Sequence, residues 1–346
     1  MPGLGAIVSK RRPFDAVLVV AFGGPLGPAD IRPFLRNVLR GRQVPAARFE
    51  EVVTHYEHFG GVSPLTAITR RQADGLRERL WRRGLPMPVY VGMRNWHPLL
   101  PDTLRQMALD GVRQAIGFVC AAHRSYSSCT QYRQNVLEAR AGLVAGGLPD
   151  VTVTYVNDWH TRNGFIEPNA RHLVAALDRL PPAVRGRARV VFTAHSLPAR
   201  MSGADRYRTQ LHESAALVAA RAGASEWAVV YQSRSGSPQD PWLEPDVCDY
   251  LRAERARGLE AAVLSPIGFL CDHVEVLYDL DHEAAAICRE IGLSMTRAAA
   301  VNDDPRFLDL MADTVLEAAA RYEHGIPLPI VSAQPPQRVE GPPVAR

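Results

Sequence analysis

Three carboxylates, Glu275, Asp279 and Glu283, stand four residues apart in the segment 272–283. On an α-helix each four-residue step turns the side chain by only about 40°, and the three together climb about 12 Å, so they share one face. Their mutual repulsion destabilises the helix unless water solvates the stripe or a cation binds it. The stripe follows directly on the apolar run 261–269, which places Glu275 near the end of an expected strand. Two interpretations stay open at this point, a solvated helix face and a cation site.

A second reactive side chain, His195, ends the apolar run 189–195. A histidine in such a position is more often a hydrogen-bonded core residue than a ligand. Together with carboxylates that follow a different strand, however, it could face Glu275 across a cleft. An imidazole with a pKa near 6.5 accepts a proton at neutral pH, and carboxylate oxygens hold Fe²⁺ without trapping it. The pair therefore suits chemistry that moves protons and a divalent metal.

Short apolar runs rich in β-branched residues alternate with amphipathic stretches along the chain. The expected strands cover 16–22, 88–93, 114–122, 151–156, 189–195, 227–233 and 261–269. The expected helices cover 28–39, 64–83, 100–110, 131–145, 165–179, 207–222, 245–258, 274–291 and 305–322. This alternation predicts an α/β fold with mostly parallel sheets.

The strands fall into two groups, which predicts two doubly wound, Rossmann-like lobes. We expect an N-terminal lobe at 14–160 and a C-terminal lobe at 161–304. In such folds a ligand binds beyond the carboxyl ends of the strands, near a topological switch point, so we expect the site in a cleft between the lobes. The tail at 326–346, rich in Pro and Gln, is predicted to be disordered.

The composition excludes several classes of function. The chain has 346 residues, 47% hydrophobic and 22% charged, with a formal charge of +4, which is too mild to indicate a nucleic-acid partner. Five cysteines, odd in number and without a CxxC pair, argue against a disulfide framework and favour a reducing compartment. Because there is neither a signal peptide nor an apolar stretch long enough to span a membrane, we expect a cytoplasmic protein, and a monomer.

Several catalytic motifs are missing. The glycine-rich segment 21–25 lacks the GxGxxG spacing of a dinucleotide site and the GK[ST] of a P-loop. The chain also has no GxSxG elbow and no HExxH. Nucleotide binding and hydrolysis therefore have no support in the sequence.

Six segments, in collinear order between about residues 15 and 322, resemble the ferrochelatase family. They are AFGGPLGPADIRPFLRNVL, HYEHFGGVSPL, YVGMRNWHPLLPDTLRQM, FTAHSLP, YQSRSGSPQDPWLEPDV and SPIGFLCDHVEVLYDLDHE. Any one could arise by chance, whereas all of them in order form a specific signal. The resemblance implies an enzyme of haem biosynthesis that inserts ferrous iron into a porphyrin held between two lobes. It also implies that the helix 305–322 packs back on the N-terminal lobe.

The same resemblance implies roles for the two reactive segments. His195 matches the active-site histidine of the family and Glu275 its paired acid, while Asp279 and Glu283 match an acidic ladder that conducts metal or protons. All four are therefore expected to contact the metal. Insertion requires that two pyrrole protons leave and that the metal sheds its waters. Whether His195 or Glu275 takes the protons stays open, since a coupled titration can share them.

Other residues resemble those that line the macrocycle. Tyr56, Ser63 and Tyr132 match such positions in coproporphyrin-type members. Two positions depart from the pattern. Phe22 stands where some members have a tyrosine that touches the metal, which excludes an axial oxygen ligand there. His55 stands where such members often have an arginine that faces a propionate.

The segments SYSSCTQY, DPWLEPDV and VEVLYD look more like the branch that uses coproporphyrin III than the branch that uses protoporphyrin IX. The extra propionates of coproporphyrin call for basic groups at the mouth of the cleft. On chemistry alone, Arg40, Arg42 and Arg94 are candidates.

Ferrous iron is expected as a substrate, with no tightly bound cofactor. Some members carry a [2Fe–2S] cluster, for which Cys129 could be the first ligand, but no cysteine follows Cys288, so we expect no such cluster.

Two rival functions stay open. One is a chelatase for cobalt or nickel on a related tetrapyrrole, because His and carboxylate ligands do not dictate iron. The other is a non-catalytic carrier of haem or porphyrin.

Overall fold

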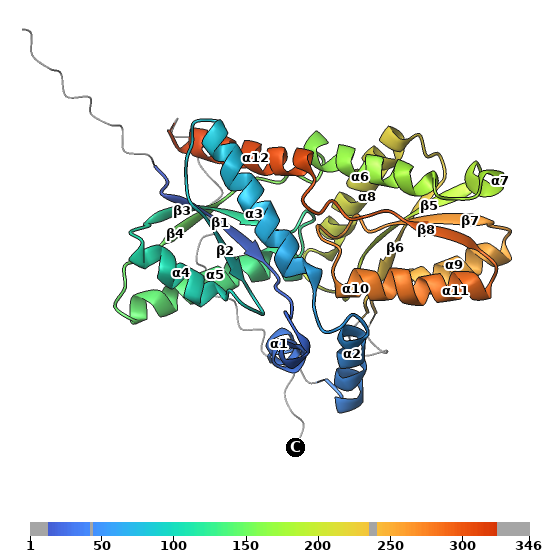
Figure 1. The fold of residues 1–346 in the computed structure, drawn as a ribbon, viewed down its shortest axis with the longest axis horizontal. Coiled ribbons are helices and arrows are strands. Elements are labelled where there is room, and N and C mark those ends of the chain that lie inside the picture. The colour runs from blue at the N-terminus through green and yellow to red at the C-terminus, as the bar shows by residue number, and fades with distance from the viewer. Residues whose placement is uncertain (1–12, 42–43, 235–240, 324–346) are drawn as a thin grey trace, which may run out of the picture.

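The computed structural model describes residues 13–41, 44–234 and 241–323. The candidate Arg42 and the predicted disordered tail at 326–346 lie outside these residues. Within them, the expected alternation of strands and helices is present, and the chain forms two parallel sheets that lie side by side (Figure 1).

The first sheet has the order β2-β1-β3-β4 and the second the order β6-β5-β7-β8, and every pairing is parallel. The first contains β1 Ala16–Ala21, β2 Val89–Met93, β3 Gln114–Val119 and β4 Thr152–Tyr155. The second contains β5 Ala188–His195, β6 Trp227–Gln232, β7 Ala261–Ser265 and β8 Ser294–Arg297. The prediction of two doubly wound α/β units is confirmed. The strand β8 was not expected, because its four residues are only half-buried and lack an apolar run.

Helices cover both faces of each sheet (Figure 1). The helices of the described residues are α1 Ile31–Val38, α2 Ala46–His58, α3 Pro64–Arg82, α4 Leu100–Leu109, α5 Gln131–Ala145, α6 Asn163–Leu177, α7 Pro182–Arg185, α8 Ala204–Ala222, α9 Val247–Ala256, α10 Val274–Val276, α11 Ala285–Glu290 and α12 Pro305–Glu323. Two of them, α1 and α2, lie apart from both sheets (Figure 1). A short 3-10 turn, Pro28–Asp30, precedes α1, and a π-helical turn, Tyr126–Thr130, precedes α5. The sequence did not predict α2, which buries only Val53 and Tyr56 and so lacks a clear apolar stripe.

The strand β1 shows how two cores are built from one run of apolar residues. Val17 and Val19 face a core that includes α3 and α12, whereas Leu18 and Val20 face a second core with α4 and α5. All four are fully buried. Successive side chains of a strand point to opposite faces, so a strand between two helix layers must be apolar throughout.

The last helix, α12, packs on both α3 and α6 (Figure 1). Nε of Arg79 in α3 lies 2.7 Å from a carboxylate oxygen of Asp309. Arg162, which precedes α6, donates a hydrogen bond to the carboxylate of Glu317 at 2.8 Å. Phe307 is fully buried in a core that contains side chains from both sheets. Because α12 contacts both α3 and α6, the packing of this helix on the N-terminal lobe and the lobe boundaries at 14–160 and 161–304 stay predictions.

A wide π-helix, Leu277–Ala284, lies between α10 and α11 where one regular helix was expected. Arg297, at the end of β8, donates hydrogen bonds to Asp272 before the π-helix and to Asp281 within it, both at 2.7 Å. Asp272 also accepts a hydrogen bond from Asn302, at 2.7 Å. Arg297 and Asp272 are mostly buried, with 14% and 18% of their side chains exposed. Arg297 therefore holds the segment before α10 and the middle of the π-helix to the second sheet.

The substitution Arg297→Met should lower the free energy of unfolding by roughly 3 kcal/mol, because it leaves the buried carboxylate of Asp272 without its cation. Urea unfolding measures this loss. Arg252 is the control, since its pair with Glu290 at 3.5 Å is exposed, and Arg252→Met should cost less than about 1 kcal/mol. Equal small losses in the two variants would show that Arg297 does not stabilise the π-helix.

Candidate active site

The site lies at the carboxyl end of β5, where β5 has β6 on one side and β7 on the other. This is a topological switch point, the place where parallel α/β sheets bind ligands. The chain that leaves β7 passes close to β5, because the amide of Gly268 donates to the carbonyl of Thr193 at 3.0 Å. A Cβ at Gly268 would lie 2.5 Å from the Cβ of Ala194. Only glycine allows this approach, which brings the segment carrying Glu275 beside His195.

The imidazole of His195 has a defined orientation. Its Nδ1 lies 2.6 Å from the carbonyl oxygen of Ser196. A carbonyl can only accept, so in the neutral ring Nδ1 carries the proton and Nε2 keeps a free lone pair. The carbonyl of His195 itself accepts from the hydroxyl of Tyr207 at 3.2 Å. His195 is therefore oriented to act as a base through Nε2.

Glu275 faces that nitrogen. Its Oε2 lies 3.9 Å from Nε2 of His195, and both side chains are about one-third exposed, 35% for His195 and 37% for Glu275. The distance is too long for a direct hydrogen bond, and it leaves room for a substrate atom or a water to contact both groups. The structure thus brings together the two residues that the sequence predicted as catalytic.

Asp279 is the next carboxylate of the acidic ladder (Glu275, Asp279 and Glu283). It accepts hydrogen bonds from the amide of Gln232, at 3.1 Å, and from the hydroxyl of Ser233. Burial, with a further contribution from the charges of Glu275 and Glu283, raises the pKa of Asp279 to about 7. Near neutral pH this carboxyl can gain or lose a proton, or exchange a proton for a metal ion.

Glu283, the outermost carboxylate, lines the same cavity as Asp279, a space of 510 Å³. Burial, followed by the charge of Asp246, raises the pKa of Glu283. Within residues 13–41, 44–234 and 241–323, no group of three or more His, Cys, Asp or Glu side chains is arranged to hold a metal ion. The ladder therefore offers separate carboxylates in sequence rather than one closed cage.

Arg94, Phe22 and Tyr132 lie together at the carboxyl end of the first sheet. The guanidinium of Arg94 lies 4.7 Å from the ring centroid of Tyr132 and 5.9 Å from that of Phe22. Asn135 accepts a hydrogen bond from Nε of Arg94 at 2.7 Å, which fixes the guanidinium. Arg40, also a candidate, is exposed at the end of α1 and contacts Asn37.

The other residues expected to line the macrocycle lie on or next to α2. His55 stacks on Tyr278 of the π-helix, with ring centroids 3.6 Å apart. Tyr56 is buried against Phe34, and Ser63 is buried as the N-cap of α3, where its hydroxyl accepts from an amide. Tyr132, Tyr56 and Ser63 have less than a tenth of their surface exposed. Their contact with a porphyrin stays a prediction.

Two parts of the site were missed by the sequence analysis. Gln232 and Ser233 were recognised only as the end of a strand, although they are the partners of Asp279. A signal was present, since Gln232 ends the strand that pairs with β5 and lies opposite His195 in the register. The bracing of the π-helix by Arg297 left no signal in the sequence, because it depends on the position of β8.

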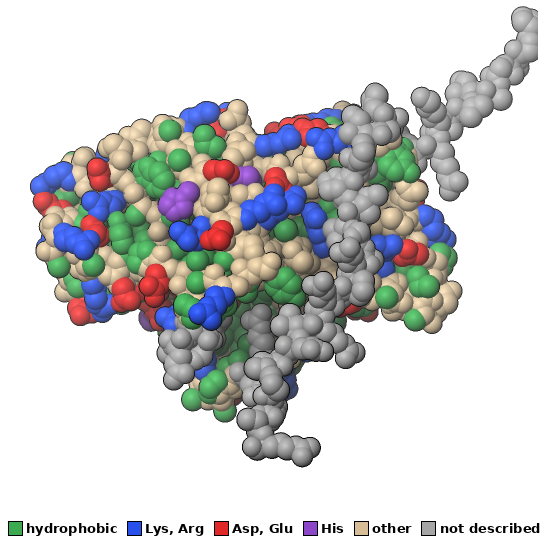
Figure 2. All heavy atoms as spheres, turned by 180° about the vertical axis from the view of Figure 1, so that it is seen from behind, with side chains coloured by type: hydrophobic (Ala, Val, Ile, Leu, Met, Phe, Trp, Pro, Cys, Tyr) green, Lys and Arg blue, Asp and Glu red, His purple; other side chains and the backbone are tan. Residues whose placement is uncertain are grey.

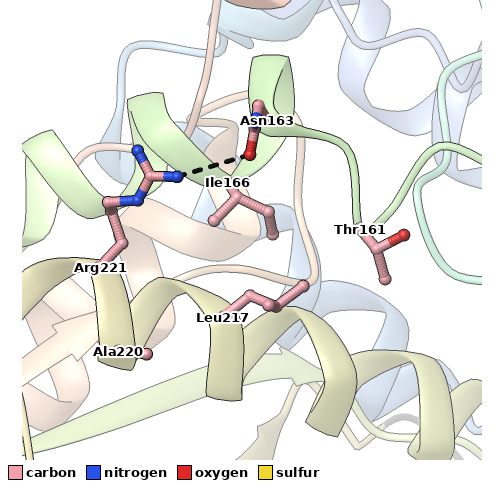
Figure 3. Close-up of a pocket in the computed structure, with 6 residues that line it drawn as sticks. All are labelled: Thr161, Asn163, Ile166, Leu217, Ala220 and Arg221. Atoms are coloured by element: carbon pink, nitrogen blue, oxygen red, sulfur yellow. Dashed lines mark hydrogen bonds between the residues drawn. The ribbon is translucent and has the colours of Figure 1, made fainter.

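A second cavity, of 330 Å³, lies between α6 and α8 (Figure 3). Its lining includes Arg221, which points toward Asn163 and donates to it at 3.5 Å. None of its residues belongs to the predicted site.

On the face shown in Figure 2, basic and acidic side chains are interspersed. All five cysteines are free, and in the part of the chain that the structure describes no helix is long and apolar enough to cross a membrane.

The chain is similar to known proteins over most of its length. The family model described as ferrochelatase matches residues 14–319. A coproporphyrin III ferrochelatase of Streptomyces coelicolor is 45% identical over 90% of this chain and 87% of its own. One of Mycolicibacterium smegmatis is 43% identical over 95% and 93%. Among solved structures, SirB of Bacillus subtilis, with Fe³⁺, is 11% identical, covers 90% of this chain and 98% of its own, and has a TM-score of 0.54.

The likeness to SirB concerns the fold alone, because the identity is so low. The family model and the curated relatives, by contrast, span nearly the whole chain, including both strand ends that carry the site. On this evidence the chain belongs to the ferrochelatase family.

Proposed function

We propose that this protein inserts ferrous iron into coproporphyrin III, with release of the two pyrrole protons, as a step of haem biosynthesis. Membership of the family supports the metal-insertion reaction, and relatives named coproporphyrin III ferrochelatase support the choice of porphyrin. The observation that carries the proposal is the oriented lone pair of His195 Nε2, which faces Glu275 at the switch point of the second sheet.

In this mechanism Nε2 of His195 takes the two pyrrole protons one at a time and releases each to solvent, to which the side chain is 35% exposed. Its Nδ1–H stays bonded to the carbonyl of Ser196, so a proton arriving at Nε2 makes an imidazolium whose orientation does not change. The carboxylate of Glu275 stabilises that charge across the 3.9 Å separation. Proton removal and charge stabilisation are thereby divided between His195 and Glu275.

The acidic ladder supplies the metal. Ferrous iron arrives hydrated, and each carboxylate oxygen can replace a water without binding as tightly as a thiolate would. Asp279 is well suited to an intermediate stage, because a carboxyl whose pKa is about 7 can give up its proton when a cation approaches. Glu283 would take the metal first and Glu275 last, next to His195.

The porphyrin carboxylates need cations, and arginine provides a planar pair of donors for each. Arg94 is the best-placed candidate, because Asn135 holds its guanidinium beside Phe22 and Tyr132. Coproporphyrin carries more propionates than protoporphyrin, so it gains more from such contacts.

A metal other than iron and a non-catalytic carrier are the rival functions. A cytoplasmic location, a monomeric state and the lack of a cofactor remain predictions.

The substitutions His195→Ala and Glu275→Gln should each lower kcat by about 10²-fold or more, since each removes a group that acts on the reacting protons. Initial rates of anaerobic iron insertion measure the loss. His212→Ala, which removes an exposed imidazole from α8, is the control and should keep the full rate. Near-normal insertion by His195→Ala would exclude its role as the base.

The raised pKa of Asp279 predicts a pH-dependent stability. Its pKa is about 7 when folded and 3.8 in the reference state, so between these values the folded chain holds a proton that the unfolded chain releases. The free energy of unfolding must then fall as the pH rises from about 4 to about 7. Asp279→Asn removes this fall. As the pH rises from ~4.5 to ~8, the free energy of unfolding of the variant should therefore increase by on the order of 2 kcal/mol relative to that of the unsubstituted chain.

Urea unfolding of the metal-free protein, with a chelator present, measures that difference at several pH values. Asp205→Asn is the matched control, because the side chain of Asp205 is fully exposed. Parallel pH curves for the unsubstituted chain and Asp279→Asn would show that Asp279 titrates as an ordinary carboxylate.

The choice of porphyrin is tested by anaerobic Fe²⁺ insertion into coproporphyrin III and protoporphyrin IX, followed by absorbance. We expect kcat/KM to favour coproporphyrin III by roughly tenfold or more, because its additional propionates meet charged partners. A preference for protoporphyrin IX would overturn the proposed substrate but not the reaction. Tight binding of both without insertion would indicate a carrier.

A further inference from the structure

Four rings from α2 and the π-helix form a group beside the acidic ladder, here called the imidazole cluster: His55, His58, Tyr278 and His282. The ring of Phe59 contacts the group at His58. His55 stacks on Tyr278, with centroids 3.6 Å apart and planes at 13°. The ring centroids of Tyr278 and His282 are 5.0 Å apart. The ring centroid of His58 lies 4.5 Å from that of His282 and 6.2 Å from that of Tyr278. The stacked pair joins the two segments, and so it holds the rings of His58 and His282 near each other.

The imidazole cluster adjoins the cavity of the ladder. Tyr278 and His282 both line the 510 Å³ space that also contains Asp279 and Glu283. His58 and His282 themselves are exposed. A cation bound at His282 would therefore lie between solvent and the cavity that the partly buried Asp279 lines.

Two imidazoles at this separation can share one metal ion. The ring nitrogens of two histidines that bind the same ion lie closer than their ring centroids, and tilted rings allow both lone pairs to converge. His58 and His282 are tilted by 58°. Imidazole nitrogen suits Fe²⁺, Zn²⁺, Co²⁺ and Ni²⁺ and discriminates against Mg²⁺ and Ca²⁺, which prefer oxygen. Carboxylates alone do not make that distinction.

We propose that His58 and His282 form a binding site for a divalent first-row transition ion at the solvent end of the acidic ladder. Two protein ligands leave the other coordination positions to water, so the ion is held weakly and can move on. This open site fits the finding that, among the residues described, no group of three such ligands is arranged to hold a metal. The role of the site in delivering iron rests on the proposed function.

The simplest alternative is that the rings only pack against one another. Exposed aromatic and imidazole rings do stack, and the contact between His55 and Tyr278 is of this kind. Packing alone, however, does not require that His282 line the cavity of the ladder, nor that its partner be another imidazole. The two readings differ in a single measurable property, metal binding that depends on both His58 and His282.

The test uses the full-length protein without porphyrin and titrates Zn²⁺ by calorimetry. His58→Gln and His282→Gln keep a polar, exposed side chain but remove the imidazole. Because the carboxylates of the ladder also bind Zn²⁺, each variant is compared with a control, His212→Gln, in which an equally exposed imidazole is removed from α8. We expect both test variants to lose the same binding event and the control to keep it.

The delivery role is tested with iron in the insertion assay. Loss of the site should raise KM for Fe²⁺ in both test variants, while KM for the porphyrin stays at the value of the His212→Gln control. Unchanged Zn²⁺ binding in His58→Gln and His282→Gln would overturn the site. Lost binding with an unchanged KM for iron would overturn its role in delivery. If the protein inserts no iron, the Zn²⁺ titration still decides whether the site exists.

Discussion

The parallel pairing of β5 with β6 on one edge and β7 on the other is the constraint on which the site depends. It sets Phe192 opposite Ser265, so β7 ends three residues before β5 does, and the chain must then travel along the end of β5. Gly268 makes this path possible, because any side chain there would collide with Ala194. The segment then enters α10, where Glu275 faces His195, and continues into the π-helix. The geometry of the acid–base pair is thus a consequence of strand register and one glycine, not of a direct bond between the two residues.

Much of this arrangement is visible in the sequence, because it depends on local patterns. Buried parallel strands are continuous apolar runs, and polar residues that end such runs must lie at the ligand-binding edge of a sheet. His195 and Glu275 were found in this way, and the structure places them 3.9 Å apart. The expected parallel α/β architecture is confirmed for the same reason, since alternating strands and helices permit few other topologies.

The remaining features depend on contacts between distant segments. The helix α2 was missed because only Val53 and Tyr56 are buried, so its position is set by packing on α1 and α10 rather than by its own periodicity. A carboxylate spacing of four residues predicts a regular α-helix, but the segment 277–284 is a π-helix, and the widening requires an external support such as Arg297. The partners of Asp279 belong to a different strand, and nothing near Asp279 in the chain identifies them.

Two carboxylates of the π-helix differ in the charge of their partners. Asp281 and Asp279 are two residues apart, yet Asp281 is paired with Arg297, whereas Asp279 has only the neutral donors Gln232 and Ser233 among the described residues. The chain contains 40 basic residues, so cations are not scarce. A partly buried carboxylate without a cation costs stability, and here the cost is seen as a pKa raised to about 7. A permanent arginine partner would remove that cost, but it would also occupy the position that a passing ferrous ion needs. Under the proposed function, the transit of a cation accounts for the carboxylate of Asp279 that has no cationic partner among the described residues.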